Sequence, residues 1–286
     1  MASQAAGIAV IGHANIKPYQ LAIAGFREHI QLPLQIYYLN RTSEQNKATA
    51  RAIHQQHPVL IFALGKSALR FARRMRCDVP IVFTFVLHPP HASNAVHSSE
   101  FGIAMSIPPA QQFNRLMTIV PTIQDMAVVY NPKKSKAMVE QAKVAAKHLG
   151  IHFIAIPASN QKDAAAGVAE VMPKVDAMWM IPDVTVLTST TWKQMLHLSL
   201  KHSVALIGLA PKYVRSGCLF ALSFDSYSIG AQAADMARRL LAGKKVPLQT
   251  SPNIAHFTLN QHTAKQLGLY LSPSLLKQVD YLYGET

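Results

Sequence analysis

The sequence predicts an α/β protein of two lobes, each with a parallel sheet covered by helices. Short runs rich in Val, Ile and Phe alternate with amphipathic stretches, which is the order of elements in parallel sheets. This alternation occurs twice in succession along the chain. The length of 286 residues is too great for one small core and suits two lobes of about 100–150 residues each.

The first series of elements occupies the first 106 residues. Apolar runs predict strands at 7–11, 34–39, 59–63, 81–86 and 102–105. Apolar residues gather on one face of two intervening stretches, which predicts helices at 17–29 and 67–75.

The second series repeats this architecture. Strands are expected at 126–130, 152–157, 177–182 and 204–209, and helices at 135–149, 161–171 and 190–202. Asn131 and Pro132 indicate a helix start, because Asn caps free amides and Pro is tolerated where no donor is needed. Gly150 is expected to end that helix in a left-handed turn.

The remaining elements return to the first lobe and then to the second. A strand at 219–224 leads into a long helix at 227–241, and the Pro-rich stretch 246–252 suits a crossing between lobes. The tail, 275–283, is expected to be a short capping helix with Ser272 and Pro273 at its start. The predicted lobes, joined by a hinge, are 1–106 with 225–255, and 107–224 with 256–286.

Composition excludes several classes of protein. Half of the residues are apolar, with 13 Gly and 17 Pro, which excludes disordered and collagen-like chains. The two cysteines, Cys77 and Cys218, are too few for a disulfide scaffold and too far apart for a metal-binding pair. No window reaches about 18 uninterrupted apolar residues, so no membrane span is expected.

The net charge of +14 raises the question of a nucleic-acid partner. The excess is spread, at +6, +6 and +2 in residues 1–106, 107–224 and 225–286. The densest basic runs, 70–76 and 133–136, lack the interleaved aromatics that single-strand binders use for stacking. We interpret these runs as solvated helix faces that attract anions generally, and we expect no nucleic-acid partner.

The segment Gly65-Lys66-Ser67 follows a predicted strand and opens a helix, as the end of a phosphate-binding loop does. Leu60 stands where such a loop requires its first glycine, so a nucleotide site is not expected. A weaker anion site remains, with Ser67 as N-cap and helix amides that favour a carboxylate or phosphate. A plain strand-to-helix turn explains the segment equally well.

Catalytic and metal-binding patterns are absent from the sequence. His88, His91 and His97 are close in sequence, but Glu100 is the only acid near them and no HExxH frame occurs, so no metal is expected. No GxSxG elbow, activated cysteine or suitable acid pair occurs either. We therefore expect no enzyme, no catalytic residues and no cofactor.

Two acids and several aromatic residues stand where predicted strands end. Ligands of open α/β sheets collect at the carboxyl ends of the strands, so Asp183 and Asp225 are candidates for binding a ligand cation such as an ammonium. The alternative role for each is a helix N-cap. Aromatic residues at the same strand ends, which are candidates for lining a cleft and stacking on a flat ligand, are Phe85, Tyr130, Phe224 and Tyr227.

A series of short motifs spans nearly the full chain. They are Lys17-Pro18-Tyr19, Gly25-Phe26, Ala63-Leu64-Gly65, Val79-Pro80-Ile81-Val82-Phe83, Val129-Tyr130-Asn131-Pro132, Ile181-Pro182-Asp183, Ser226-Tyr227-Ser228-Ile229-Gly230, Leu259-Asn260, Ala264 and Leu267-Gly268-Leu269. In this order they resemble the ABC-transporter substrate-binding proteins related to tryptophan-binding lipoprotein receptors. The resemblance implies the type I periplasmic-binding-protein fold, in which two Rossmann-like lobes close on a ligand.

The resemblance also implies a function. Such a protein is an exported receptor that delivers a small molecule, often an aromatic amino acid, to an ABC permease in the membrane. By this resemblance the loop 65–67 offers amides and a hydroxyl to a carboxylate, and Asp183 faces an ammonium. Tyr130, Asn131 and Tyr227 would form walls of the pocket.

Two segments depart from the family pattern. Leu87-His88-Pro89-Pro90 stands where relatives commonly have Asp-Pro, and Gly12-His13-Ala14-Asn15 replaces the usual start of the first helix. His13 and His88 favour a more anionic ligand in a basic protein. We expect a monomer that binds an amino acid or a similar small zwitterion or anion by hinge closure.

The location and two other functions stay open at this point. The start of the sequence lacks the basic and long apolar regions of a secretory signal, so the protein is either cytoplasmic or has lost a signal. The family implies a periplasmic or membrane-anchored protein. A ligand-sensing regulatory domain of the same fold is the first alternative. An α/β enzyme is more remote, because residues 7–12 lack the GxGxxG fingerprint.

Overall fold

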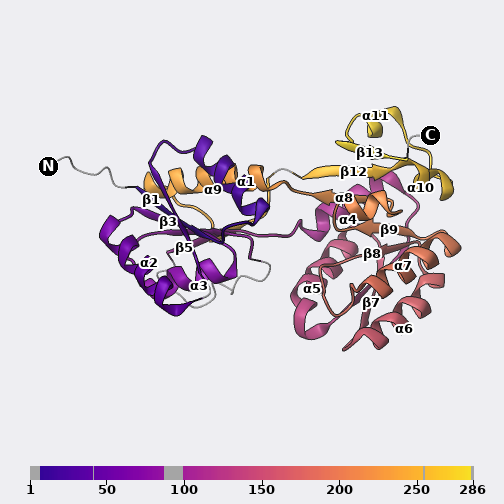
Figure 1. The fold of residues 1–286 in the computed structure, drawn as a ribbon. Coiled ribbons are helices and arrows are strands. Elements are labelled where there is room, and N and C mark those ends of the chain that lie inside the picture. The colour runs from indigo at the N-terminus through magenta and orange to yellow at the C-terminus, as the bar shows by residue number, and fades with distance from the viewer. Residues whose placement is uncertain (1–6, 41, 87–98, 254, 285–286) are drawn as a thin grey trace. The chain divides into compact units, whose positions relative to one another are not determined.

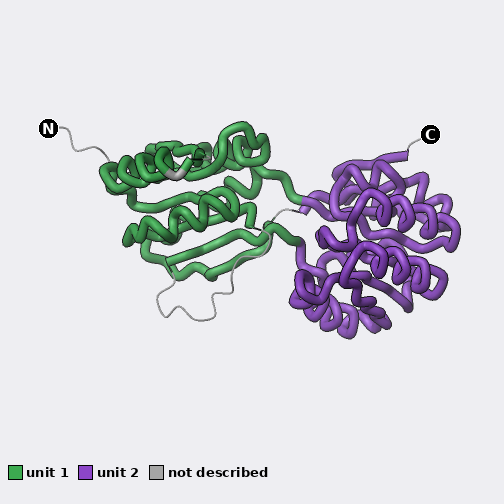
Figure 2. Tube along the Cα trace, turned by 60° about the horizontal axis from the view of Figure 1, so that its bottom comes forward, with its two compact units in different colours: residues 1–106, 224–254 green, residues 107–223, 255–286 purple. Residues whose placement is uncertain are grey.

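The computed structural model describes residues 7–40, 42–86, 99–253 and 255–284. The chain forms two compact units (Figure 2). Unit 1 comprises residues 1–106 and 224–254, and unit 2 comprises residues 107–223 and 255–286. Among the described residues, no helix is long and apolar enough to cross a membrane.

Unit 1 is built on a six-stranded sheet in the order β11-β5-β4-β3-β1-β2. Every neighbouring pair of these strands is parallel. The strands are β1 (Ile8–Gly12), β2 (Leu34–Tyr38), β3 (Leu60–Leu64), β4 (Ile81–Thr84), β5 (Glu100–Ile103) and β11 (Gln249–Thr250). The helices are α1 (Lys17–Glu28), α2 (Ser43–Gln56), α3 (Lys66–Met75) and α9 (Ser226–Leu241).

Helices cover both faces of the unit 1 sheet (Figure 1). Successive side chains of a strand point to opposite faces, so Ile8 and Val10 of β1 pack toward α1 and α9, whereas Ala9 and Ile11 pack toward α2 and α3. The central strands are therefore apolar on both faces, as the continuous apolar runs of the sequence predict.

Two glycines allow α1 and α9 to approach each other closely. A Cβ atom on Gly25 would overlap the carbonyl oxygen of Tyr227, and one on Gly230 would overlap the carbonyl oxygen of Ala22. Each overlap involves backbone, which cannot move aside as a flexible side chain can. The contact attaches α9 to the first sheet, although 197 residues lie between Glu28 and Ser226 along the chain.

Unit 2 has a seven-stranded sheet in the order β13-β12-β10-β9-β8-β6-β7. All neighbouring pairs are parallel except β10 and β12, which are antiparallel. The strands are β6 (Asp125–Tyr130), β7 (His152–Pro157), β8 (Ala177–Trp179), β9 (Ala205–Gly208), β10 (Phe220–Ser223), β12 (His256–Asn260) and β13 (Tyr281–Tyr283).

The unit 2 sheet is also covered on both faces. Figure 1 shows α4 (Pro109–Ile119) and α5 (Pro132–His148) on one side, and α6 (Gln161–Val171) and α7 (Ser189–His202) on the other. The shorter helices are η1 (Met172–Lys174), α8 (Pro211–Arg215), α10 (Gln261–Gln266) and α11 (Pro273–Leu276). The architecture confirms the predicted α/β class with two mostly parallel sheets.

Most predicted elements of the two series are present, and the cap predictions for α5 are confirmed. Asn131 accepts a hydrogen bond from the amide of Lys133 at 2.9 Å, with Pro132 in the first turn. Gly150, at φ +72°, follows the end of the helix. The sequence analysis assigned no helix to α2 or α4, whose mixed polar residues give a weaker apolar pattern.

Two predictions for the C-terminal part are wrong. The Pro-rich stretch 246–252 contains β11, which pairs with β5 at the edge of the unit 1 sheet, so it is not an irregular crossing. The tail is not a helix over 275–283: α11 ends at Leu276, and Tyr281–Tyr283 form β13 beside β12. The β-propensity of Tyr-Leu-Tyr and pairing with β12 explain this difference.

Candidate functional site

Three predicted site residues of unit 1 follow neighbouring strands. His13 follows β1, Gly65 follows β3, and Phe85 follows β4. Because β4, β3 and β1 are adjacent and parallel, their carboxyl ends lie at one edge of the sheet. The amide of Gly65 donates to the carbonyl oxygen of Thr84 at 2.8 Å, which joins the ends of β3 and β4. We call the strand ends with His13, Gly65 and Phe85 the unit 1 edge.

Tyr19, in the first turn of α1, packs against this edge. Its ring centroid lies 5.1 Å from that of Phe85. A Cβ atom on Gly65 would overlap the Tyr19 hydroxyl, so the absence of a side chain at Gly65 admits this tyrosine. Burial raises the pKa of Tyr19 above its usual value of 10.0. Tyr19 was not among the predicted site residues, although its position just after β1 and near the start of α1 is a usable signal.

The turn at 65–67 presents the start of α3 to the unit 1 edge. Gly65 is the N-cap, with φ +89°, and no side chain caps α3. The prediction that Ser67 is the N-cap is therefore wrong, because Ser67 lies inside the first turn. Lys66 and Ser67 are both exposed, and the first turn contains no acid. A helix N-terminus with these features favours an anionic group.

Phe85 has an unusual backbone conformation. Its φ is +59°, in the left-handed region that bulky residues rarely occupy. Such a conformation costs on the order of 1–3 kcal/mol. The half-buried ring packs against the apolar cluster between the sheet, α1 and α9, as well as against Tyr19. The packing of the ring offsets this backbone cost.

In unit 2, Asp183 lies in the segment after β8 and is only 1% exposed. Its Oδ2 accepts hydrogen bonds from the Asn131 amide at 2.8 Å and the Ser135 hydroxyl at 2.7 Å. Its Oδ1 accepts one from the Thr185 amide at 2.9 Å. The carboxylate therefore ties the end of β6 and the start of α5 to the segment after β8.

These hydrogen bonds keep Asp183 ionised. Burial alone would raise the pKa of this carboxyl, but the hydrogen bonds from Ser135, Asn131 and Thr185 outweigh it and lower the pKa below 3.8. Asp183 is not a helix N-cap, since Thr188 caps α7. Whether its carboxylate also faces a ligand ammonium stays a prediction.

Two further side chains extend this network through the Thr185 hydroxyl. Its oxygen accepts from the Asn131 side-chain amide at 3.1 Å and from the Lys134 ammonium at 2.7 Å. Ser135, Thr185 and Lys134 were not among the predicted site residues, although the first turn of α5 and the proximity of Thr185 to Asp183 were signals. We call the side chains of Asn131, Lys134, Ser135, Asp183 and Thr185 the Asp183 network.

Tyr130 and Asn131 lie at the carboxyl end of β6, next to β8 in the sheet. Asn131 is 7% exposed, and its side chain serves the α5 cap and the Asp183 network. Tyr130 is half-buried. The structure thus brings Tyr130, Asn131 and Asp183 to one edge of the unit 2 sheet, and their roles in binding stay predictions.

The other predicted residues have different surroundings. Asp225 is the N-cap of α9 and accepts from the Ser228 amide at 2.8 Å, which is the alternative role that the sequence allowed. The Tyr227 hydroxyl donates to Glu28 at 2.6 Å, in the last turn of α1, whereas the unit 1 edge adjoins the first turn. His88 lies outside the described residues.

No group of three or more His, Cys, Asp or Glu side chains that could hold a metal ion occurs in the described parts of the chain. Cys218 is buried, and burial raises the pKa of its thiol. Cys77 lies 3.8 Å from the ring of His54, and burial also raises its pKa. Neither thiol is activated as a nucleophile.

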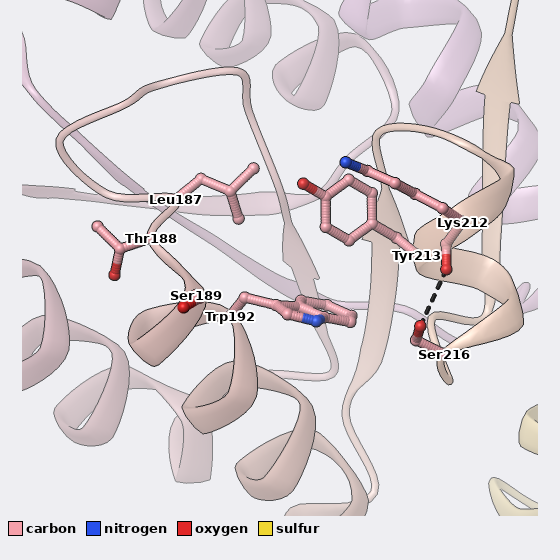
Figure 3. A pocket seen from close by; sticks show the side chains of 7 residues that line it. All are labelled: Leu187, Thr188, Ser189, Trp192, Lys212, Tyr213 and Ser216. Carbon is pink, nitrogen blue, oxygen red and sulfur yellow. Dashed lines mark hydrogen bonds between the residues drawn. The ribbon is translucent and has the colours of Figure 1, made fainter.

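Two pockets are lined by other residues. One, of about 310 Å³, lies between the start of α7 and α8 and is lined by Trp192 and Tyr213 among others (Figure 3). The other, of about 650 Å³, lies beside the C-terminal ends of α1 and α9. No predicted site residue lines either pocket. Trp192 was not among the predicted site residues, although it is one of only two tryptophans and lies in the first turn of a predicted helix.

Comparisons with known proteins agree with this architecture. The family model for ABC transporter substrate binding proteins matches residues 24–282. A tyrosine-binding protein of Clostridioides difficile is 22% identical over 221 residues, which are 73% of this chain and 63% of that protein. The match thus spans less than two thirds of the length of this curated relative.

Solved structures share the fold. A ligand-free, open substrate-binding protein with adhesive properties from Clostridium difficile has a TM-score of 0.76 at 16% identity, covering 98% of this chain and 100% of the other. An ABC domain from Streptococcus pneumoniae in complex with L-Trp has a TM-score of 0.62 at 18% identity, covering 97% and 99%. The first of these is named a substrate-binding protein, and the second holds L-Trp as its ligand. Since the family model covers nearly the whole chain, this protein belongs to the family of ABC transporter substrate-binding proteins.

Proposed function

We propose that this chain is the extracytoplasmic receptor of an ABC importer and that its ligand is an amino acid, aromatic amino acids included, or a similar small zwitterion or anion. The observation that carries the proposal is the unit 1 edge, where Tyr19 and Phe85 lie beside the start of α3, which no side chain caps. An aromatic pair next to backbone amides suits a ligand with a ring and a carboxylate.

The electrostatics of the unit 1 edge support an anionic group on the ligand. Lys66 adds a positive charge to the start of α3, and His13 lies after the adjacent strand. The turns 13–16 and 65–67 contain no acid. A carboxylate placed there would meet amides and a cation without an opposing charge.

The Asp183 network is the proposed second half of the site. Its carboxylate is kept ionised by three donors, so the negative charge needed to attract an ammonium is present at neutral pH. The relatives named tyrosine-binding and complexed with L-Trp favour an aromatic amino acid as the first ligand to test. Contacts from both units would stabilise a closed state over an open one, which is the proposed hinge closure.

The proposed partner is an ABC permease, which the family membership supports. Substrate-binding proteins of ABC importers work outside the cytoplasmic membrane, free or anchored to it, and we propose the same location for this chain. Labelling of intact cells with a membrane-impermeant amine reagent tests it. Protection of the many surface lysines in intact cells, with labelling only after lysis, would contradict it.

A thermal-shift panel of the natural L-amino acids tests the ligand class directly. A ligand at one hundred times its Kd stabilises the folded protein by about 2.7 kcal/mol, which corresponds to roughly 5–10 °C in Tm. We expect the largest rise with Tyr, Trp or Phe. Neutral sugars are the control, because they carry neither charged group. Stabilisation by a sugar and by no amino acid would overturn the proposed ligand class.

A further inference from the structure

The pocket between α7 and α8 has features of a binding site of its own. Its volume of about 310 Å³ is at the lower end of the range for small-molecule sites, which fits a ligand with a single ring. It lies within unit 2, and its lining residues are Leu187, Thr188, Ser189, Trp192, Lys212, Tyr213 and Ser216. We call it the Trp192–Tyr213 pocket.

Two aromatic rings meet in this pocket at a steep angle. The centroids of Trp192 and Tyr213 are 4.9 Å apart, with an interplanar angle of 78°. Figure 3 shows Leu187 across the open space from Tyr213, with the indole of Trp192 below. A flat apolar group placed there would contact the rings and the Leu187 side chain together.

The only charged lining residue is a cation. The Lys212 ammonium lies 4.8 Å from the centroid of the Tyr213 ring, and Figure 3 places it near the Tyr213 hydroxyl. None of the seven lining residues is acidic. The pocket therefore offers a partner to a carboxylate but none to an ammonium.

Several polar atoms of the pocket are available to a ligand. Within the described part of the chain, the Lys212 ammonium, the Tyr213 hydroxyl and the Trp192 indole N–H have no hydrogen-bond partner. By contrast, Thr188 is engaged, because its hydroxyl oxygen accepts from the Thr191 amide at 3.2 Å and caps α7. The Ser216 hydroxyl donates to the Lys212 carbonyl oxygen at 3.0 Å. The free donors thus belong to the same three side chains that supply the rings and the charge.

From this geometry we infer that the Trp192–Tyr213 pocket binds a small aromatic carboxylate without an ammonium group. The ring lies against Trp192 and Leu187, and the carboxylate pairs with Lys212 and the Tyr213 hydroxyl. None of the residues assigned to the proposed amino-acid site lines this pocket, and a zwitterion would leave its ammonium unpaired here. The inference does not depend on the proposed function.

Phenylacetate is the probe, and Trp192 is the reporter. The chain has two tryptophans, so in the Trp179→Phe variant all tryptophan emission comes from Trp192. We expect phenylacetate to change this emission saturably. Phenylacetamide, which has the ring without the charge, is expected to bind about ten-fold more weakly, and L-phenylalanine is expected to bind more weakly than phenylacetate as well.

Two lysine variants in the Trp179→Phe background separate the pocket from general attraction by a basic protein. Lys212→Met is expected to weaken phenylacetate binding about ten-fold and to leave phenylacetamide binding unchanged. Lys193→Met is the matched control, because Lys193 is exposed on α7 and does not line the pocket. No saturable change in Trp192 emission, or equal weakening by the two variants, would overturn the inference.

A competition experiment distinguishes this inference from the proposed function. An amino acid that raises the Tm of the wild-type protein is added at saturation before phenylacetate. Unchanged phenylacetate binding supports a separate site. Loss of phenylacetate binding through competition by the amino acid would overturn the inference of a separate site. A protein that no amino acid stabilises but that binds phenylacetate at Trp192 would refute the proposed ligand class and leave this inference standing.

Discussion

At the strand ends of unit 1, Tyr19 packs on Phe85 and over the bare backbone of Gly65. At those of unit 2, a buried carboxylate, Asp183, accepts three hydrogen bonds from two segments. The first arrangement depends on steric fit and a strained backbone, and the second on charge and hydrogen-bond geometry. The same type of sheet edge is therefore stabilised by different chemistry in the two units.

This difference has consequences for how each edge responds to change. Polar cross-links hold β6 and β8 together in unit 2, and a substitution that leaves their donors unpaired is costly because the site is buried. At the unit 1 edge, the cost of a substitution depends on whether the aromatic side chains can move. The two edges should therefore differ in their sensitivity to isosteric and to steric substitutions.

The largest effect is expected for Asp183→Asn. The amide keeps the size of the carboxylate, but its NH₂ group would face donors, and the buried hydrogen bonds lose their charged acceptor. We expect a loss of about 2–3 kcal/mol in the free energy of unfolding, measured by urea denaturation.

Asp176→Asn is the matched control for this substitution. Asp176 also accepts two backbone hydrogen bonds, from the amides of Gln124 and Asp125, but it is exposed. We expect its loss to stay within about 1 kcal/mol. Equal losses of unfolding free energy in the two variants would show that the burial of Asp183 does not determine how destabilising its substitution is.

A smaller effect is expected for Gly65→Ala at the unit 1 edge. The new Cβ meets the Tyr19 hydroxyl, and the residue must keep φ +89°. We therefore expect a loss of about 2 kcal/mol in the free energy of unfolding. Gly150→Ala is the reference for a positive φ without a steric contact, with an expected loss of about 1 kcal/mol in the free energy of unfolding, because nothing lies within 4 Å of a Cβ on Gly150 at φ +72°.

A double substitution separates steric contact from backbone strain. Tyr19→Phe removes the hydroxyl that the new Cβ would meet, so Gly65→Ala should cost less in that background than in the wild-type protein. The free energies of unfolding of the four proteins form a double-mutant cycle. Additivity of the two substitutions would contradict a contact between Tyr19 and Gly65.

Acid should weaken the unit 2 edge selectively. The pKa of Asp183 is lower in the folded protein than its usual 3.8, so its ionised form stabilises the fold above that value. This stability is lost as the pH falls through the folded pKa. The difference in free energy of unfolding between wild type and Asp183→Asn should therefore be constant from pH 7 to about pH 5 and shrink below about pH 4. A difference that stays constant to pH 2.5 would contradict this role of the charge.

The sequence predicted the two sheets well because their central strands are short, continuous apolar runs. β3 and β4 were found in this way, and so was the capped start of α5. The final strand, β13, was missed because three residues carry no measurable period, and only pairing with β12 stabilises them as a strand. Local pattern therefore identifies elements that bury both faces and misses those that depend on a partner distant in sequence.

The candidate site was less predictable for a similar reason. The strand order brings residues 19, 65 and 85 together, and no local motif encodes the contact of Tyr19 with Gly65. Asp183 was recognised as a scarce acid at a strand end, but two of its three donors, Asn131 and Ser135, lie at the start of α5, about 50 residues earlier in the chain. The sequence indicated where polar groups stand along the chain, and the fold determines which of them meet.

The smallest effect concerns the strain at Phe85. Phe85→Asn loses the ring contact with Tyr19, but asparagine adopts positive φ more readily than phenylalanine, so relief of strain offsets part of the lost packing. Phe101→Asn is the control, because Phe101 is also half-buried against the same cluster and has no positive φ. We expect Phe85→Asn to destabilise the protein by about 1 kcal/mol less than Phe101→Asn in urea denaturation. Phe85→Asn could instead lower the free energy of unfolding as much as Phe101→Asn does, or more. In that case the ring of Phe85 stabilises the unit 1 edge by packing alone, and backbone strain is not part of the contrast with the Asp183 network.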